Sequence, residues 1–170
     1  MQDLVTANTF LLDQAERLLV ALEDQVYAEP DGNVFGSSLG QHVRHCLDHY
    51  ASFLNGLPFS KIDYDHRERN PDLECLTECA IIEIERLRQS LRDTATVDAS
   101  TPVAVKMDCG GGDKAWHQST LGRELQFLVS HSVHHFAMIN GMCTQRGLST
   151  EEGFGIAPST LQHRKLANIG

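Results

Sequence analysis

The sequence has few basic residues, few cysteines and no long apolar run. Its 170 residues include 14 Lys and Arg against 23 Asp and Glu, which gives a formal net charge of −9. A surface of this charge repels phosphate groups, so broad nucleic-acid binding and adsorption to anionic membranes are both disfavoured. We therefore expect neither a nucleic-acid partner nor a membrane partner.

We expect no segment that directs the chain out of the cytoplasm. No apolar run approaches the roughly 18 residues that a membrane-spanning helix needs. The first residues, Met1-Gln2-Asp3-Leu4, do not combine a basic stretch with an apolar one, so no signal peptide is indicated. A cytoplasmic protein is the expectation.

The cysteines are too few, and odd in number, for a disulfide framework. The five are Cys46, Cys75, Cys79, Cys109 and Cys143. Cys75 and Cys79 are four residues apart on an expected helix, a spacing that suits a metal pair or two buried side chains. Burial is the favoured interpretation, because unpaired cysteines are commonly core residues.

Apolar residues recur at helical spacing in four segments of the chain. These segments cover about 2–27, 38–55, 71–91 and 120–146. Ser37 or Ser38 can cap the second segment, Ser119 or Thr120 can cap the fourth, and Gly147 can end it. Four helices of similar length predict an all-α four-helix bundle.

Two further segments have a different character. Residues 101–108 alternate weakly between apolar and polar, and Gly110-Gly111-Gly112 and Trp116 follow, so we predict a short β-hairpin in the connection between the third and fourth helices. The glycines lack the Lys-Ser/Thr ending of a phosphate-binding loop. The bundle should span 1–147, with 148–170 as an irregular tail packed on it.

Histidine is the unusual feature of the composition. Nine occur, and six of them fall in two short clusters, one on each of two expected helices: His42, His45, His49, His131, His134 and His135. Residues four apart lie one helical turn apart on one face, so His131 and His135 point in the same direction. Apolar residues share that face, so the two rings should point into the bundle.

A single histidine on an apolar face is usually a core residue with a hydrogen-bond partner. Several converging histidines each cost desolvation, and they repel one another once protonated. A bound cation removes both problems, because neutral imidazole is a good ligand for Zn, Ni, Fe and Cu. We therefore predict a site for one divalent metal ion.

Two familiar helical metal sites do not fit the pattern. Helical zinc proteases have Glu directly after the first histidine, whereas Ser132 follows His131 here. Carboxylate di-iron bundles use Glu-x-x-His pairs, which neither histidine-bearing segment contains. A protease and a di-iron oxidase are both disfavoured.

Over about residues 1–147 the chain resembles the DinB/YfiT-like family of metal-dependent four-helix bundles. The motifs that carry the resemblance are Ser38-Leu39-Gly40-Gln41-His42-Val43-Arg44-His45 and His131-Ser132-Val133-His134-His135. It implies that His45, His131 and His135 bind the ion. Periodicity alone places His42 and His49 nearer the core than His45, so both stay open as alternative ligands.

Three histidine ligands leave coordination positions for water or substrate, which indicates catalysis or ligand capture. The resemblance implies a small-molecule substrate and the activation of a thiol or water, as in a metal-dependent hydrolase or a thiol S-transferase, with Zn, Ni or Fe as the ion. Relatives of this kind use low-molecular-weight thiols. The broad apolar faces also lead us to expect a homodimer.

Three alternatives remain open at this stage. The chain could be a non-catalytic bundle that binds a metal or a small ligand. It could be a di-metal or haem bundle that sets His45 and His49 against His131 and His135. Finally, the histidines could simply be packed core residues.

Some neighbouring residues are candidates for supporting roles. Glu124 and Tyr50 could orient a ligating imidazole, although Glu124 also suits the first turn of a helix, where its charge complements the dipole. The charged run Arg67-Glu68-Arg69 could line a mouth, but a solvated run is the favoured interpretation.

Overall fold

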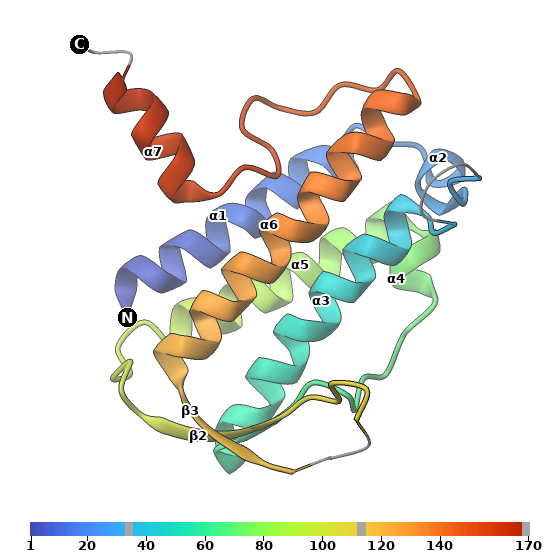
Figure 1. Cartoon of the computed structure of the whole chain (residues 1–170). Coiled ribbons are helices and arrows are strands. Elements are labelled where there is room, and N and C mark those ends of the chain that lie inside the picture. Colours follow the sequence, from blue (N-terminus) through green and yellow to red (C-terminus); the bar gives the residue numbers. More distant parts are fainter. Residues whose placement is uncertain (33–35, 112–114, 168–170) are drawn as a thin grey trace.

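The computed structural model describes residues 1–32, 36–111 and 115–167. Four long helices form the bundle: α1 (Gln2–Val20), α3 (Leu39–Gly56), α5 (Thr77–Asp93) and α6 (Leu121–Gln145). Helix α1 packs against α5 and α6, and α3 packs against the same two helices (Figure 1). The predicted four-helix bundle is therefore confirmed.

The helix ends explain why these segments begin and stop where they do. The Ser38 hydroxyl accepts from the backbone N–H of Gln41 at 3.0 Å, and the Gln41 side chain accepts from the Ser38 N–H at 3.1 Å. This reciprocal pair of hydrogen bonds satisfies two backbone N–H groups that have no acceptor within the helix. Thr120 caps α6 through the Arg123 N–H, and Gly147 follows its end with a left-handed φ of 70°.

Two of the expected helices are broken in the structure. Helix α1 stops at Val20, and the short α2 (Asp24–Ala28) follows. The third segment divides into α4 (Asp72–Cys75) and α5, because Leu76 adopts an extended conformation. The Asp24 carboxylate accepts from the N–H and hydroxyl of Thr77 at 2.8 and 2.7 Å, which caps α5 from another part of the chain.

Close packing at this break requires a glycine on α3. A Cβ built on Gly40 would lie 2.0 Å from the carbonyl oxygen of Glu74 on α4. Any side chain would force the two helices apart. The break in the third segment therefore depends on the absence of a side chain at Gly40, in the first turn of α3.

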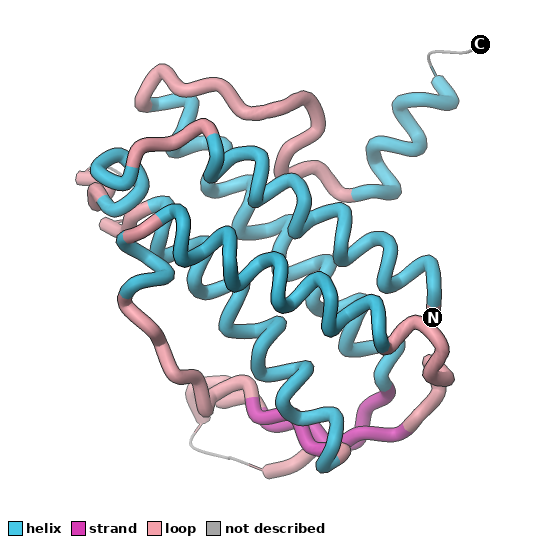
Figure 2. Tube along the Cα trace, turned by 180° about the vertical axis from the view of Figure 1, so that it is seen from behind, coloured by secondary structure: helices cyan, strands magenta, loops and turns pink. Residues whose placement is uncertain are grey.

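A small three-stranded sheet lies across one end of the bundle (Figure 2). Strands β2 (Pro102–Lys106) and β3 (His117–Thr120) pair antiparallel, which confirms the predicted hairpin, although Gly112 lies outside the described residues. Strand β1 (Lys61–Asp63) pairs parallel with β2 and was not predicted. It follows the one-turn 3-10 helix η1 (Leu57–Phe59), and three residues are too few to show strand periodicity.

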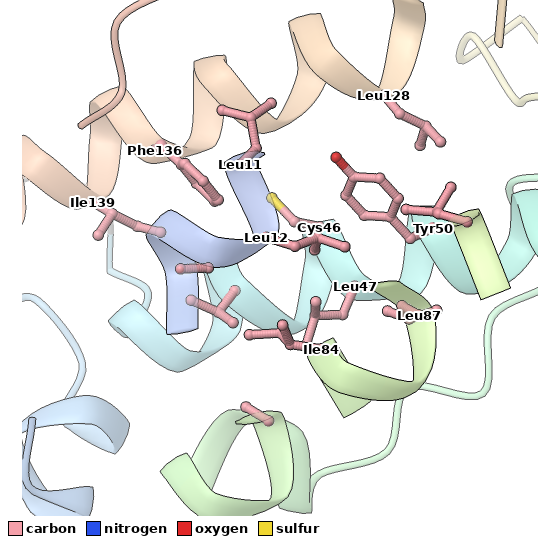
Figure 3. Close-up of a cluster of buried hydrophobic side chains, with 14 of the residues drawn as sticks. Leu11, Leu12, Cys46, Leu47, Tyr50, Ile84, Leu87, Leu128, Phe136 and Ile139 are labelled. Atoms are coloured by element: carbon pink, nitrogen blue, oxygen red, sulfur yellow. The ribbon is translucent and has the colours of Figure 1, made fainter. Parts of the chain in front are cut away.

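The core is formed by apolar side chains from all four long helices, several of which Figure 3 shows around Leu12, Leu47 and Ile84. One buried polar network crosses it. Tyr50 donates to the side-chain oxygen of Asn8 at 2.9 Å, and Ser132 donates to Tyr50 at 3.2 Å. These bonds join α1, α3 and α6, so they fix the relative positions of the helices that surround the histidines.

The C-terminal segment is only partly irregular. Phe154 stacks on Phe136 of α6 with ring centroids 4.9 Å apart, which anchors the turns before Pro158. The expectation of a wholly irregular tail is wrong, because Pro158–Ala167 forms helix α7, which has no buried residue and stands apart from the bundle (Figure 1).

Candidate metal centre

The two histidine clusters meet where α3 packs against α6. The ring centroid of His45 lies 5.0 Å from that of His131 and 4.6 Å from that of His135. His131 and His135, one turn apart on α6, have centroids 4.6 Å apart. Each ring offers one ligand nitrogen, and these three nitrogens lie within 4.8 Å of one another. Among the described residues, the three histidines thus form a group that could hold a metal ion.

An unsatisfied nitrogen shows that this cluster suits a cation. Nε2 of His131 is buried and has no hydrogen-bond partner among the described residues. Such an atom costs about 1–3 kcal/mol if it stays unpaired. A cation beside it would use that lone pair, so the cluster fits a metal ion better than it fits an apolar core.

The cluster holds its imidazoles in the neutral form that binds metals. Burial, together with the neighbouring imidazoles, lowers the pKa of His131 from 6.5 to about 3 and that of His135 to about 4. The pKa of His45 falls to about 2 through burial, the adjacent histidines and Arg67. Protons therefore do not compete with an ion at neutral pH.

His42 lies beside the three rings and bonds to one of them. Its Nδ1 is 3.0 Å from Nδ1 of His135, and its Nε2 is 2.8 Å from the hydroxyl of Ser37. If His135 donates to His42, and His42 donates to Ser37, the Nε2 lone pair of His135 is left for an ion. The position of His42 therefore suits a residue that orients His135.

His49 also adjoins the cluster. Its Nδ1 donates to the backbone carbonyl of His45 at 2.8 Å, and its ring centroid lies 4.1 Å from that of His131. This bond fixes the proton on Nδ1. His42 and His49 thus flank the convergent group, and the assignment of His45, His131 and His135 as ligands remains a prediction.

Among the described residues, neither of the proposed supporting residues forms a hydrogen bond with the three rings. Glu124 is buried and accepts from Tyr64 at 2.9 Å and from Ser119 at 2.5 Å. Tyr64 in turn stacks on His49, with centroids 5.5 Å apart. The effect of Glu124 on the cluster therefore passes through Tyr64, while Tyr50 belongs to the core network described above.

Arg67 is the contact that sequence reasoning missed. Its Nη1 lies 2.9 Å from Nδ1 of His45, so the charged run that was expected to be solvated sends one side chain into the histidine cluster. A run of alternating charges gives no sign of which member turns inward. Only the path of the chain between β1 and α4 determines it.

The cysteines do not contribute to the convergent group. Cys46 and Cys143 are buried, and burial raises the pKa of both thiols. The expectation that Cys75 and Cys79 both fill the core is wrong, because Cys75 is exposed and Cys79 is half-buried. The break at Leu76 turns this stretch away from the helical face on which the expectation rested.

The structure defines a class of helical bundles in which imidazoles from two helices converge into a group that could hold a metal ion. Within this class, the chain is a member of the DinB superfamily, whose sequence model matches residues 10–139. The resemblance seen in the histidine motifs is thereby confirmed.

Two solved structures from Bacillus subtilis share the fold. The DinB-like protein YjoA superposes with a TM-score of 0.62 at 16% identity, covering 86% of this chain and 93% of that chain. YfiT, described as a probable metal-dependent hydrolase with an unusual four-helix bundle topology, gives a TM-score of 0.65 at 17% identity, covering 86% and 87%. At these identities, the likeness establishes the fold alone.

A curated relative is closer in sequence. FK506-binding protein 5 of Rhizopus delemar is 34% identical over 106 residues, which are 61% of this chain and 28% of that protein. The chain therefore matches little more than a quarter of that relative's length. Among the described residues, no helix is both long and apolar enough to cross a membrane.

Proposed function

We propose that this protein is a divalent-metal enzyme of the hydrolase or thiol S-transferase type, with His45, His131 and His135 as the metal ligands. The observation that carries the proposal is the convergence of these donors around a buried, unpartnered nitrogen of His131. Zn, Ni and Fe all accept this donor set. The description of YfiT as a probable metal-dependent hydrolase supports the same class of reaction.

Three neutral ligands leave the charge of the ion uncompensated and some of its coordination positions open. A divalent ion held by His45, His131 and His135 would lower the pKa of a bound water or thiol and so supply a nucleophile at neutral pH. The residues of the chain hold the ligand rings in place. His42 orients His135, and Phe127 packs against His131 with centroids 5.4 Å apart.

Elemental analysis of the purified protein tests the site. We expect about one divalent ion per chain in the wild type, and loss of most of it in the variant His131→Ala/His135→Ala. His163→Ala is the matched control, because His163 is exposed on α7, away from the cluster. Equal metal content in the wild type and the double variant would show that the site does not exist.

The type of reaction needs a second measurement. The metal-loaded protein is incubated with a low-molecular-weight thiol and an electrophile, and separately with an activated ester. Consumption of the thiol indicates transfer, and release of the acid indicates hydrolysis. A protein that retains its ion and catalyses neither reaction would instead fit the alternative of a non-catalytic metal- or small-ligand-binding bundle.

A further inference from the structure

Arg67 occupies an unusual position for a charged side chain. It belongs to the loop between β1 and α4, yet its guanidinium reaches Nδ1 of His45 at 2.9 Å. Guanidinium has only donors, so Nδ1 of His45 must be the acceptor. The proton of the neutral His45 ring therefore resides on Nε2 in this arrangement.

Within the part of the chain that the structure describes, the remaining donors of Arg67 lack an anionic partner. Its Nε is buried without a hydrogen bond, and Arg67 forms no ion pair with a carboxylate among the described residues. Burial and the neighbouring positive charges of Arg69 and Arg44 lower the pKa of Arg67, and Asp48 and Asp65 only partly offset the effect. Arg44, by contrast, is paired with both Asp48 and Glu74. Arg67 is thus a partly desolvated cation with donors to spare.

A metal ion at the histidines and the Arg67–His45 bond exclude each other. If Nδ1 of His45 binds the ion, Arg67 loses its acceptor. If Nε2 of His45 binds the ion, the neutral ring must carry its proton on Nδ1. Two N–H donors, one from His45 and one from Arg67, would then point at each other, and no hydrogen bond could form between them. Either way, a metal ion releases the guanidinium from His45.

The released side chain borders a cavity of suitable size. Arg67 lines a cavity of about 520 Å³, together with Asp48, Ser52, Lys61 and His66. This volume falls within the range of small-molecule sites, roughly 300–1,000 Å³. None of the clustered histidines lines the cavity, and Arg67 connects the cavity to them through its hydrogen bond to His45.

We propose that Arg67 binds a carboxylate group of the small-molecule substrate, and that metal binding makes it available by releasing it from His45. This inference rests on the proposed function, because it assumes an ion at the three histidines. A planar guanidinium matches a carboxylate through two parallel hydrogen bonds. The cavity lining carries slightly more negative than positive charge, and this repels a doubly charged phosphate more than a singly charged carboxylate. Its carboxylates are Asp48, Asp63, Glu68 and Glu83, and its cations are Lys61, Arg67 and Arg86.

The test compares two thiol probes on the Co²⁺-loaded protein. 3-Mercaptopropionate carries a carboxylate and 2-mercaptoethanol does not, while the sulfur of each gives a charge-transfer absorption when it binds cobalt. We expect the wild type to bind the carboxylate probe tighter by about tenfold, the effect of a charge-assisted hydrogen bond. In Arg67→Gln this preference should disappear, whereas the affinity for 2-mercaptoethanol should persist.

The matched control is Arg92→Gln, which removes the same charge from an exposed position in the last turn of α5, outside the cavity lining. It should keep the wild-type preference. An equal preference in the wild type and Arg67→Gln would overturn the proposal, as would a failure of the cobalt-loaded wild type to bind either thiol. If the wild type binds no metal at all, it is the proposed function that fails.

A second measurement separates this role from simple support of His45. Removing Arg67 removes both a competitor for His45 and a nearby positive charge, so Arg67→Gln should bind Zn²⁺ several-fold more tightly than the wild type. A residue that only holds His45 in place would give weaker Zn²⁺ binding when removed. A decrease in affinity, measured by competition with a chelating dye, would therefore contradict the release mechanism.

Discussion

Metal addition should stabilise the folded protein, and His131 should carry most of the effect. An ion that binds only the folded chain adds about 4 kcal/mol to the free energy of unfolding when its concentration is a thousand times its Kd. A chain of 170 residues unfolds with an entropy of roughly 0.36 kcal/mol per kelvin. The midpoint of thermal unfolding should therefore rise by roughly 11 °C.

The same reasoning predicts a different response for His131→Ala. Without metal, the substitution removes packing contacts but also removes a buried, unpaired nitrogen. The lost packing destabilises the variant, whereas the removal of the unpaired nitrogen stabilises it. The midpoint of thermal unfolding should therefore differ from that of the metal-free wild type by only about 3 °C. With metal, the variant should gain little and lie roughly 10 °C below the wild type.

Circular dichroism melts in Zn²⁺ and in excess chelator give the four midpoints. His163→Ala, on α7, should follow the wild type in both conditions. The reasoning is refuted if His131→Ala loses as much stability in chelator as in Zn²⁺, because the ring would then act only through packing. An equal metal-induced shift in the wild type and the variant would refute it as well.

Three further predictions concern pH, His42 and Gly40. The folded pKa values of His45, His131 and His135 lie below the 6.5 of an unfolded histidine, so the unfolded chain takes up more protons and stability falls as the pH drops below about 6.5. Because the three rings are partly exposed to solvent, we halve the expected effect. Between pH 6.5 and 5.5, the free energy of unfolding of the metal-free protein should then fall by about 1.5 kcal/mol, as measured by urea unfolding. In the variant His45→Ala/His131→Ala/His135→Ala, this loss of stability below pH 6.5 should vanish. If the loss persists, other groups cause it. His42→Ala should weaken Zn²⁺ binding by about tenfold, as judged by chelator competition, because His135 loses the group that orients it; unchanged affinity would exclude that role. Gly40→Ala should lower the free energy of unfolding by about 3 kcal/mol, because its Cβ would clash with the Glu74 carbonyl. Gly141→Ala on α6, where an added Cβ would have nothing within 4 Å, should not destabilise the protein and is the matched control.

The helices and the histidine faces could be predicted because both depend on local geometry. Apolar residues at intervals of three and four mark the buried face of a helix, and the same rule places His131 and His135 one turn apart. Ser38, one of the two expected caps of α3, is the residue that caps it, and it does so with Gln41 three residues later. Such signals need no knowledge of the rest of the fold.

The errors arose where distant parts of the chain act on one another. The third helical segment has continuous periodicity, yet it breaks at Leu76, because Asp24 caps Thr77 and because Gly40 lets Glu74 approach α3. Strand β1 depends on pairing with β2, which lies far along the chain. Neither contact leaves a pattern in the local sequence.

The sequence by itself determined that this chain is a helical bundle with two histidine-bearing helices, because helical periodicity is a property of neighbouring residues. Only the tertiary structure decided which imidazoles converge, since the packing of α3 on α6 sets the distances among His45, His131 and His135. It also decided that Arg67, rather than Arg69, reaches His45. The path of a loop follows from the packing of the whole molecule, and a run of charged residues cannot encode it.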